Sequence, residues 1–245
     1  MSNKPIALLD LDDNLFQTRT KCSEYDDTDL ELVSIASNGN HSYLTPVQKV
    51  MVDWLLSSTE AIPVTARGTG AYARAKIPFR SYAIIANGAV ILDKNGNPDE
   101  EWQDIMSKAL APYQNQLSDI LQLGNGAAEL SEIDVRSWIV KENDLSTYVV
   151  FKENDGDGSA LKHILTTSGR DGWVRHHNGN NLAIIPPVVS KRIASEFLLK
   201  RLRSDGIVRP VIGFGDSVTD YSYLSLCDFW GSPKVSQISN VMNGV

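Results

Sequence analysis

Residues 6–16 read IALLDLDDNLF, a short apolar run that ends abruptly in acidic residues. An unbroken apolar run of this length is typical of a buried parallel strand, so Ile6–Leu9 is predicted to be one. Asp10 and Asp12 follow directly. Ligands of doubly wound sheets bind beyond the carboxyl ends of strands, where two such carboxylates can serve a hard cation and a nucleophilic or acid–base role together. The alternative is an ordinary acidic turn.

The composition excludes several classes of protein. The 245 residues carry 23 Lys+Arg against 30 Asp+Glu, a formal net charge of −7, and 42% are hydrophobic, as in globular domains. This balance argues against nucleic acid or an anionic membrane as a partner, and the apolar runs are too short to span a bilayer. Asp10 interrupts the early apolar run, which does not fit a secretion signal, and the two cysteines share no metal-ligand spacing. A cytoplasmic setting is expected.

The first part of the chain alternates strand and helix patterns. Thr45, Pro46 and Gln48 predict a capped helix start, and Leu30–Ala36 a strand within the polar segment 17–43. The helix is predicted to bury a stripe formed by Val47, Val50, Met51, Trp54 and Leu55. The next predicted elements are a strand at 61–65, a helical stretch at 72–76, and a hairpin of 82–86 and 89–92 about Asn87-Gly88.

The middle of the chain changes to an α+β pattern, which predicts a helix over 99–123 interrupted near Pro112, strands at 134–140 and 147–152, a helix at 159–167, and a hairpin of 173–177 and 182–185. After Pro186-Pro187 the first pattern returns. Ser190 is predicted to cap a helix that buries Ile193, Ala194, Phe197, Leu198 and Leu202, before a strand at 210–214. We therefore predict a Rossmann-like doubly wound parallel sheet, residues 1–92 and 186–245, with an inserted α+β cap domain, residues 93–185.

Three further features lie near predicted strand ends or helix starts. Thr65 can bind an anion together with backbone N–H groups, or cap the following helix. Lys191 lies in the first turn of a helix, where the macrodipole disfavours a cation, so either an anion compensates or the lysine is simply exposed. Asp216 and Asp220 in the stretch GDSVTD can complete an oxygen-rich Mg²⁺ site. Ser217 and Asp220 also have capping-box spacing, and both roles can hold at once.

Two other patterns point less clearly to ligands. Residues 68–73 fit the dinucleotide fingerprint loosely, but they follow a short strand that contains Pro63, so no dinucleotide cofactor is expected. His176 and His177 are adjacent on a predicted strand and face opposite sides, so they do not easily share a metal ion. Together with Asn178 and Asn181 they lie around a polar turn that either contacts substrate or is solvated.

The order of these features resembles the haloacid dehalogenase-like phosphatases over the whole chain. The stretches that carry the likeness are LLDLDDNLF from residue 8, PVTARG from residue 63, VVSKRIASEFL from residue 188 and GFGDSVTD from residue 213. IIANGAVILD, from residue 84, is similar to the Cof-type branch, which includes sugar phosphatases and sucrose-phosphate phosphatase-like enzymes. That branch carries an α+β cap between its second and third motifs, where this chain has its α+β block.

The resemblance implies a role for each motif residue. Asp10 would attack phosphorus, and Asp12 would protonate the leaving oxygen and then activate water. Asp10, the backbone carbonyl of Asp12, and Asp216 would hold Mg²⁺, with Asp220 supporting its water shell. Thr65 and Lys191 would bind the phosphoryl oxygens, and Arg67 and Asn87 are further candidate substrate contacts. Mg²⁺ and a lysine would offset the repulsion between a carboxylate and an anionic phosphate monoester.

The expected activity is hydrolysis of small phosphorylated metabolites, sugar phosphates above all. Asn14 stands where the family usually has Thr, which puts the positioning of the first loop in question. A phosphomutase is the nearest enzyme alternative and would require a bisphosphorylated activator. A receiver-type signalling module would be about half as long and lack the inserted block. A catalytically silent binding protein would not be expected to keep Asp10, Asp12, Lys191 and Asp216.

Overall fold

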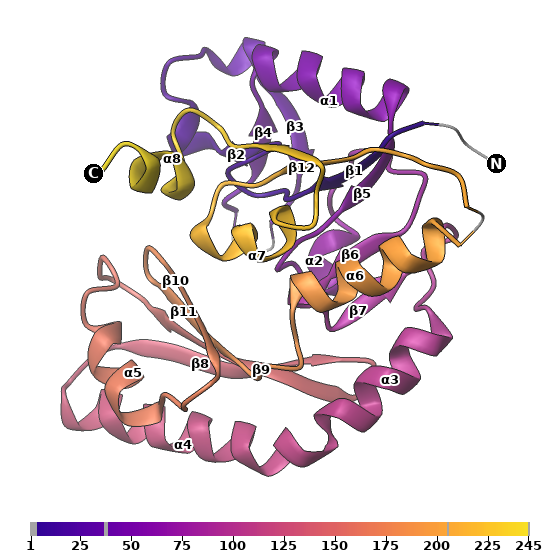
Figure 1. Cartoon of the computed structure of the whole chain (residues 1–245). Helices are drawn as coiled ribbons and strands as arrows, with labels where there is room; N and C mark the ends of the chain where they lie inside the picture. The colour runs from indigo at the N-terminus through magenta and orange to yellow at the C-terminus, as the bar shows by residue number, and fades with distance from the viewer. Residues whose placement is uncertain (1–3, 37–38, 205, 245) are drawn as a thin grey trace. The chain divides into compact units, whose positions relative to one another are not determined.

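The computed structural model describes residues 4–36, 39–204 and 206–244, and the chain divides into two compact units (Figure 1). The core unit comprises residues 1–99 and 191–245, and the inserted unit residues 100–190. The helices and strands of the core unit are β1 (Ile6–Leu9), β2 (Gln17–Thr18), β3 (Glu31–Ser34), β4 (Ser42–Leu44), α1 (Pro46–Ser58), β5 (Glu60–Pro63), α2 (Thr69–Tyr72), β6 (Ala83–Ile85), β7 (Val90–Leu92), α6 (Lys191–Leu202), β12 (Val211–Phe214), α7 (Tyr221–Leu224), β13 (Phe229–Gly231) and α8 (Gln237–Met242). Those of the inserted unit are α3 (Glu100–Leu110), α4 (Gln114–Leu130), β8 (Val135–Glu142), β9 (Leu145–Glu153), α5 (Leu161–Ser168), β10 (Val174–Asn178) and β11 (Asn181–Ile185).

A parallel sheet of order β13–β12–β1–β5 forms the centre of the core unit. Every residue of β1 is buried, which confirms the predicted buried strand. Its last residue, Leu9, pairs with Phe214 of β12 on one side and with Pro63 of β5 on the other. The loops that leave β1, β5 and β12 therefore start from the same edge of the sheet. Figure 1 shows α1 on one face of this sheet and α6 and α7 on the other.

The buried face of α1 differs from the predicted one. The predicted capping box at Thr45 is present, and Val52 and Leu55 pack against Ala7 and Leu9 of β1. Three members of the predicted stripe face solvent instead: Val47 and Val50 are each 71% exposed, and Trp54 is 51% exposed. The reason is that this helix carries apolar residues on more than one side, and its contact with the sheet selects the side of Val52 and Leu55.

The polar segment 17–43 folds back on itself as a small sheet of order β2–β4–β3, with residues 37–38 outside the described part. The predicted strand within 30–36 is confirmed as β3, one arm of a hairpin with β4. The helical stretch predicted at 72–76 is wrong, because α2 ends at Tyr72. The chain beyond it pairs with β3 instead: Lys76 N–H donates to Val33 O (2.7 Å), and Ala75 bridges Ser34.

Two other local predictions are corrected in detail. The hairpin about Asn87-Gly88 is confirmed as β6–β7, but residues 86–89 connect the strands, and Ala86, Asn87 and Gly88 have φ values of 50°, 57° and 95°. A two-residue turn is not used because Ala86 N–H donates to Arg67 O. In α6, Ile193 is 42% exposed rather than buried, since the helix packs through Ala194, Ser195, Leu198 and Leu199.

The inserted unit is an antiparallel sheet of order β10–β11–β9–β8 with α4 and α5 on one of its faces (Figure 1). Leu117 and Ile120 of α4 pack against Phe151, Leu182 and other sheet residues. The predicted interruption near Pro112 is present as a 3-10 turn, Ala111–Tyr113, between α3 and α4. With the parallel core sheet, this insertion confirms the predicted fold class. No helix in the described part of the chain is long and apolar enough to cross a membrane.

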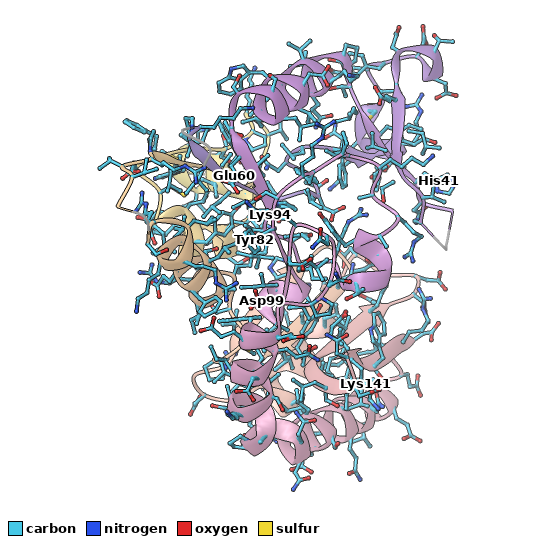
Figure 2. The ribbon with its side chains drawn as sticks, turned by 90° about the vertical axis from the view of Figure 1, so that its right-hand side faces the viewer. His41, Glu60, Tyr82, Lys94, Asp99 and Lys141 are labelled. Carbon is cyan, nitrogen blue, oxygen red and sulfur yellow. The ribbon has the colours of Figure 1, made fainter. Side chains whose placement is uncertain are left out.

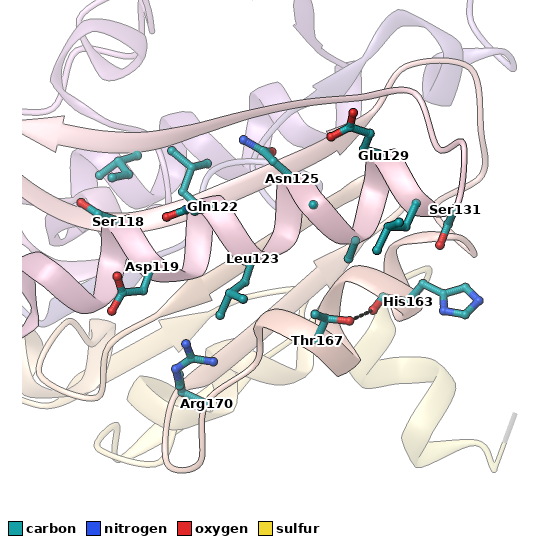
Figure 3. Close-up of a pocket in the computed structure, with 15 residues that line it drawn as sticks. Ser118, Asp119, Gln122, Leu123, Asn125, Glu129, Ser131, His163, Thr167 and Arg170 are labelled. Atoms are coloured by element: carbon teal, nitrogen blue, oxygen red, sulfur yellow. Dashed lines mark hydrogen bonds between the residues drawn. The ribbon is translucent and has the colours of Figure 1, made fainter.

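A groove of about 1110 Å³ lies between α4 and α5 (Figure 3). Asp119 and Glu129 of α4 line it on one side, and Arg170, in the loop after α5, lines it on the other. Arg170 donates to the carbonyls of Ser168 and Gly169. Charges of both signs therefore line this groove.

A buried ion pair joins Glu60, the first residue of β5, to Arg209, which lies two residues before β12. Arg209 Nη2 lies 2.6 Å from Glu60 Oε2, and its Nε donates to Lys4 O at 2.8 Å. The side chains of Arg209 and Glu60 are 5% and 10% exposed. Figure 2 shows Glu60 beside Lys94, which lies 3.2 Å from Glu60 Oε1. Burial acts to raise the pKa of Glu60, but hydrogen bonds from Ser81 and Arg209 and the charge of Lys94 outweigh it and lower that pKa.

We expect Arg209→Met to lower the free energy of unfolding by about 3–5 kcal/mol, because it leaves a buried carboxylate without its closest cation. Lys108→Met is the matched control, since Lys108 is 76% exposed and pairs with Asp104 one helical turn away. Its loss should be less than about 1 kcal/mol. Urea unfolding followed by circular dichroism measures both. Equal losses of unfolding free energy in the two variants would show that the buried ion pair stabilises the fold no more than an exposed one.

Candidate active site

Three buried carboxylates meet at the edge of the core sheet. Asp10, Asp216 and Asp220 each offer an oxygen, and these oxygens all lie within 4.8 Å of one another. Asp10 directly follows β1, and Asp216 lies two residues beyond β12. Because β1 and β12 are parallel neighbours, their ends deliver both acids to one place. Asp220 enters from the 3-10 turn Val218–Asp220 that follows.

Lys191 binds two of these acids at once. Its Nζ lies 2.6 Å from Asp10 Oδ1 and 2.7 Å from Asp220 Oδ1, and its side chain is only 11% exposed. Burial acts to lower the pKa of Lys191, but the charges of Asp10 and Asp220 outweigh it and raise that pKa. The ammonium therefore stays protonated, and the alternative of a simply exposed lysine is wrong. The first residue of α6 carries a cation because two anions compensate it.

The remaining negative charge makes this a candidate cation site. Burial raises the pKa of Asp10 well above its usual range; Lys191 opposes this rise, while Asp220 and Asp216 add to it. Burial, followed by the charges of Asp220 and Asp13, raises the pKa of Asp216 to about 7. Close carboxylates that resist joint ionisation are stabilised by a divalent cation, and an all-oxygen set suits Mg²⁺. The residues present therefore fit that ion.

Asp220 has a different environment from the other two acids. Its Oδ2 accepts hydrogen bonds from Ser217 N–H (3.0 Å) and Ser217 Oγ (2.8 Å), and its Oδ1 accepts from Lys191. The bond from Ser217 N–H is one half of the capping box that the sequence allows, so Asp220 has this role alongside a place in the acidic cluster. Both oxygens are engaged, so Asp220 is suited to fixing Lys191 and the turn rather than to coordinating a cation directly.

Asn14 ties the first loop to the neighbouring strand. Its buried side chain donates from Nδ2 to Asp10 O (2.8 Å) and to Phe214 O (3.2 Å). Tyr223 Oη donates to the same Phe214 carbonyl (2.7 Å). A threonine hydroxyl has a single hydrogen to donate, whereas the amide has two. Asparagine at this position therefore connects the ends of β1 and β12 through one side chain.

Asp12 is not a member of the acidic cluster, and its carboxylate pairs with Arg67. The guanidinium contacts both carboxylate oxygens, with Nη2–Oδ1 at 2.6 Å and Nε–Oδ2 at 2.7 Å. Arg67 also donates to Ser34 Oγ and lies 4.8 Å from the centre of the Phe16 ring. The side chain of Asp12 is half exposed, so it is accessible to solutes.

Thr65 and Asn87 lie together at the end of β5. Thr65 is buried, its Oγ1 accepts from Arg67 N–H (3.1 Å), and its carbonyl accepts from Asn87 N–H (3.0 Å). Gly68, not Thr65, is the cap of the short helix α2, so the helix-cap alternative for Thr65 is wrong. The preceding residue, Val64, donates to Leu9 O, which places Thr65 at the same sheet edge as Asp10.

The four polar candidates near residue 180 belong to the inserted unit and form a separate set. Strand register pairs His176 with Ala183 and His177 with Leu182, which confirms that the two histidines face opposite sides of the sheet. Asn181 pairs with Lys152 and lies on the side of His176. The side chain of Asn178 lies outside the described part of the structure. Only His176 and Asn181 of this set can therefore be placed on one face.

Sequence reasoning missed several residues that shape the core site. Asp13 raises the pKa of Asp216 and contacts Lys21 at 2.6 Å. Ser34 and Phe16 hold Arg67, and the ring of Tyr223 lies 5.8 Å from Lys191 Nζ. Asp13 could have been noticed as a third acid beside Asp12. Ser34 could not, because its contact with Arg67 spans 33 residues and depends on the fold of segment 17–43.

Similar structures exist among known proteins, although no protein-family model matches the chain and no curated protein sequence matches it. The C-terminal domain of trehalose-6-phosphate phosphatase from C. albicans superposes with a TM-score of 0.58 at 13% identity, covering 91% of this chain and 74% of that one. The sucrose-phosphatase from Synechocystis, in complex with sucrose and phosphate, gives 0.57 at 12% identity, covering 98% and 96%. Both of these proteins are phosphatases, and this chain shares their fold.

Proposed function

We propose that the chain is a Mg²⁺-dependent phosphatase of small phosphorylated metabolites, chiefly sugar phosphates, that works through an aspartyl-phosphate intermediate. The observation that carries this proposal is the buried cluster in which the Lys191 ammonium contacts Asp10 beside Asp216 and Asp220. It offers a nucleophile, a cation site and a phosphate-binding cation at one sheet edge. The shared fold with two phosphatases supports the assignment.

Asp10, the backbone carbonyl of Asp12, and Asp216 are proposed to hold Mg²⁺, which would supply positive charge for the phosphoryl oxygens. An oxygen of Asp10 forms the new bond to phosphorus while the ester P–O bond breaks. Asp12 donates its proton to the leaving oxygen and later takes one from the water that attacks the phosphoryl-enzyme. This releases inorganic phosphate and restores the Asp10 carboxylate. Thr65 and Lys191 bind phosphoryl oxygens throughout.

The ion pair between Arg67 and Asp12 bears on this scheme. The guanidinium occupies both oxygens of the Asp12 carboxylate, so the pair has to open before Asp12 can reach a leaving oxygen. An anionic substrate offers Arg67 an alternative partner with the same bidentate geometry. We propose that substrate draws Arg67 from Asp12, and that the inserted unit is the cap domain of the enzyme.

The metal is tested first. Phosphate release from glucose 6-phosphate should stop in excess EDTA and return with Mg²⁺, because unneutralised carboxylates repel the anionic substrate. Ca²⁺ should restore it poorly, since its looser coordination misplaces the nucleophile. A malachite-green assay measures the released phosphate. Full activity in excess EDTA would refute the metal role of Asp10 and Asp216.

The two carboxylates of the first motif should have separable effects. Asp10→Asn should abolish turnover while leaving the circular dichroism spectrum unchanged, and Asp12→Asn should reduce kcat by about 10²–10⁴-fold through loss of acid–base assistance. Asp53→Asn removes an exposed acid of α1 and serves as the control, with kcat close to that of the parent. A phosphoryl-enzyme trapped with the Asp10 carboxylate unmodified would contradict the nucleophile assignment.

The dependence on Mg²⁺ should vary with pH. Burial and the neighbouring acids raise the pKa of Asp216 to about 7, so below that pH a proton competes with the cation for this carboxylate. The Mg²⁺ concentration for half-maximal activity should therefore rise by up to about tenfold per pH unit below neutrality, and level off above it. Asp13→Asn removes one of the charges that raise this pKa, so it should move the onset to lower pH. A Mg²⁺ requirement that stays constant between about pH 5.5 and 8 would contradict the Asp216 assignment.

A further inference from the structure

The parallel sheet of the core unit has an open edge at β13. The order β13–β12–β1–β5 makes β13 the outer strand, and among the described residues only β12 pairs with it. Gly231 O accepts from Gly215 N–H (3.4 Å), so the backbone of Gly231 faces β12. Backbone groups of successive residues point to alternate sides of a strand, so the N–H and C=O of Trp230 face the open edge. An edge with such groups can bind one further strand.

Large apolar side chains are exposed on both faces of this edge. Phe229 is 69% exposed, and Trp230, which points to the opposite face, is 40% exposed. Trp230 contacts Tyr221 of α7, with ring centroids 5.8 Å apart, and Tyr221 is 55% exposed. Side chains of this type carry about 150–250 Å² each, so roughly 250–400 Å² of aromatic surface is open to solvent. Apolar surface gathered in this way marks an interaction site.

The apolar surface continues beyond the strand. A groove of about 500 Å³ lies beside Phe229 and is also lined by Val208 and Pro210. Both of these residues are exposed, and Val208 is 96% exposed. The surface therefore extends from β13 to the loop that leads into β12.

The charges around β13 favour a second copy of this chain as the partner. The net charge of −7 opposes self-association in general. The strand itself is uncharged, and the acid before it, Asp228, lies 3.3 Å from Arg203. Lys234, an exposed lysine after the strand, has no ion pair among the described residues. An antiparallel arrangement places the Asp228 end of one copy beside the Lys234 end of the other, so opposite charges meet.

We propose that two copies of the chain associate through β13, with the two strands antiparallel about a two-fold axis at Trp230. The two Trp230 residues exchange N–H and C=O hydrogen bonds, which joins two sheets of four strands into one of eight. Phe229 then lies opposite Gly231 of the other copy. The half-buried Phe214 ring occupies the space that a side chain at Gly231 would fill, so Phe229 meets an aromatic ring there. One strand supplies both halves of the contact, as a two-fold axis requires.

The size of the surface predicts a reversible dimer. The strand has only three residues, and the exposed aromatic surface is smaller than the roughly 800 Å² per partner of a standard interface. We therefore expect a Kd in the micromolar range. The inference does not depend on the proposed phosphatase activity, because no residue of β13 belongs to the acidic cluster.

Sedimentation equilibrium of the full chain, at concentrations across the micromolar range, tests this pairing. The parent chain should show a reversible monomer–dimer equilibrium. Phe229→Lys and Phe229→Glu should each raise the dimer Kd by at least about tenfold, because two like charges then lie roughly 7–8 Å apart across the axis. An equal mixture of the two variants should dimerise again, since a lysine then lies near a glutamate.

Leu130→Lys is the matched control, because Leu130 is an 89% exposed apolar residue of α4 in the inserted unit. It introduces the same charge and should leave the Kd unchanged. Melting temperatures verify that each variant is folded. Hydrogen exchange needs no variant: the Trp230 amide of the parent chain should exchange more slowly as the protein concentration rises, because its N–H becomes bonded.

Three results would overturn the proposal. The first is a parent chain that stays monomeric across this range, with Trp230 exchange independent of concentration. The second is a parental Kd in both Phe229 variants. The third is a mixture of the two variants that stays monomeric, which would show that Phe229 does not lie near its counterpart and would assign the edge to a different partner.

Discussion

The contact of the Lys191 ammonium with Asp10 and Asp220 is the interaction on which the core site depends. In the sequence, Lys191 is separated from Asp10 by 181 positions and from Asp220 by 29. The contact therefore connects the end of β1, the start of α6 and the turn after β12. A buried ammonium that lost these partners would cost several kcal/mol, as would either carboxylate without it. The same contact also explains why a lysine can begin α6 against the helix macrodipole.

This interaction leaves the site short of positive charge. Three carboxylates surround one ammonium, and the pKa values of Asp10 and Asp216 rise because burial penalises the charge that Lys191 does not balance. The electrostatic conflict is a cost to folding if the site stays empty, and a divalent cation relieves it. An ion pair whose only role was to stabilise the fold would not need a third acid beside it. The excess acid is therefore better explained by ligand binding than by stability.

Short-range patterns gave reliable predictions where the local structure depends on residues close together in the sequence. Ile6–Leu9, the capping box at Thr45 and the break near Pro112 are all present, because each depends on neighbouring residues. The fold class followed from the change of pattern in the middle of the chain. The predicted buried stripe on α1 was wrong because the helix has two competing apolar faces. Val47, Val50 and Trp54 lie on one, the buried Val52 and Leu55 lie on the other, and contact with the sheet decides which face is buried.

Contacts between residues far apart in the sequence limited how much of the candidate site could be predicted. The sequence placed Asp10, Lys191, Asp216 and Asp220 at strand ends and helix starts, and parallel register brings them together. The pairing of Asp12 with Arg67 could not be predicted from the sequence. Arg67 is held by Ser34 and Phe16, whose positions depend on how the segment after β1 folds.

Anomalous diffraction from crystals soaked in Mn²⁺, which replaces Mg²⁺ at oxygen sites, tests the central claim most directly. We expect one strong peak in direct contact with the carboxylates of Asp10 and Asp216, and its loss in Asp216→Asn. Asp119→Asn, which removes an acid of the groove between α4 and α5, should keep the peak. Crystals with no peak at Asp10 and Asp216, or with an undiminished one in Asp216→Asn, would contradict the account.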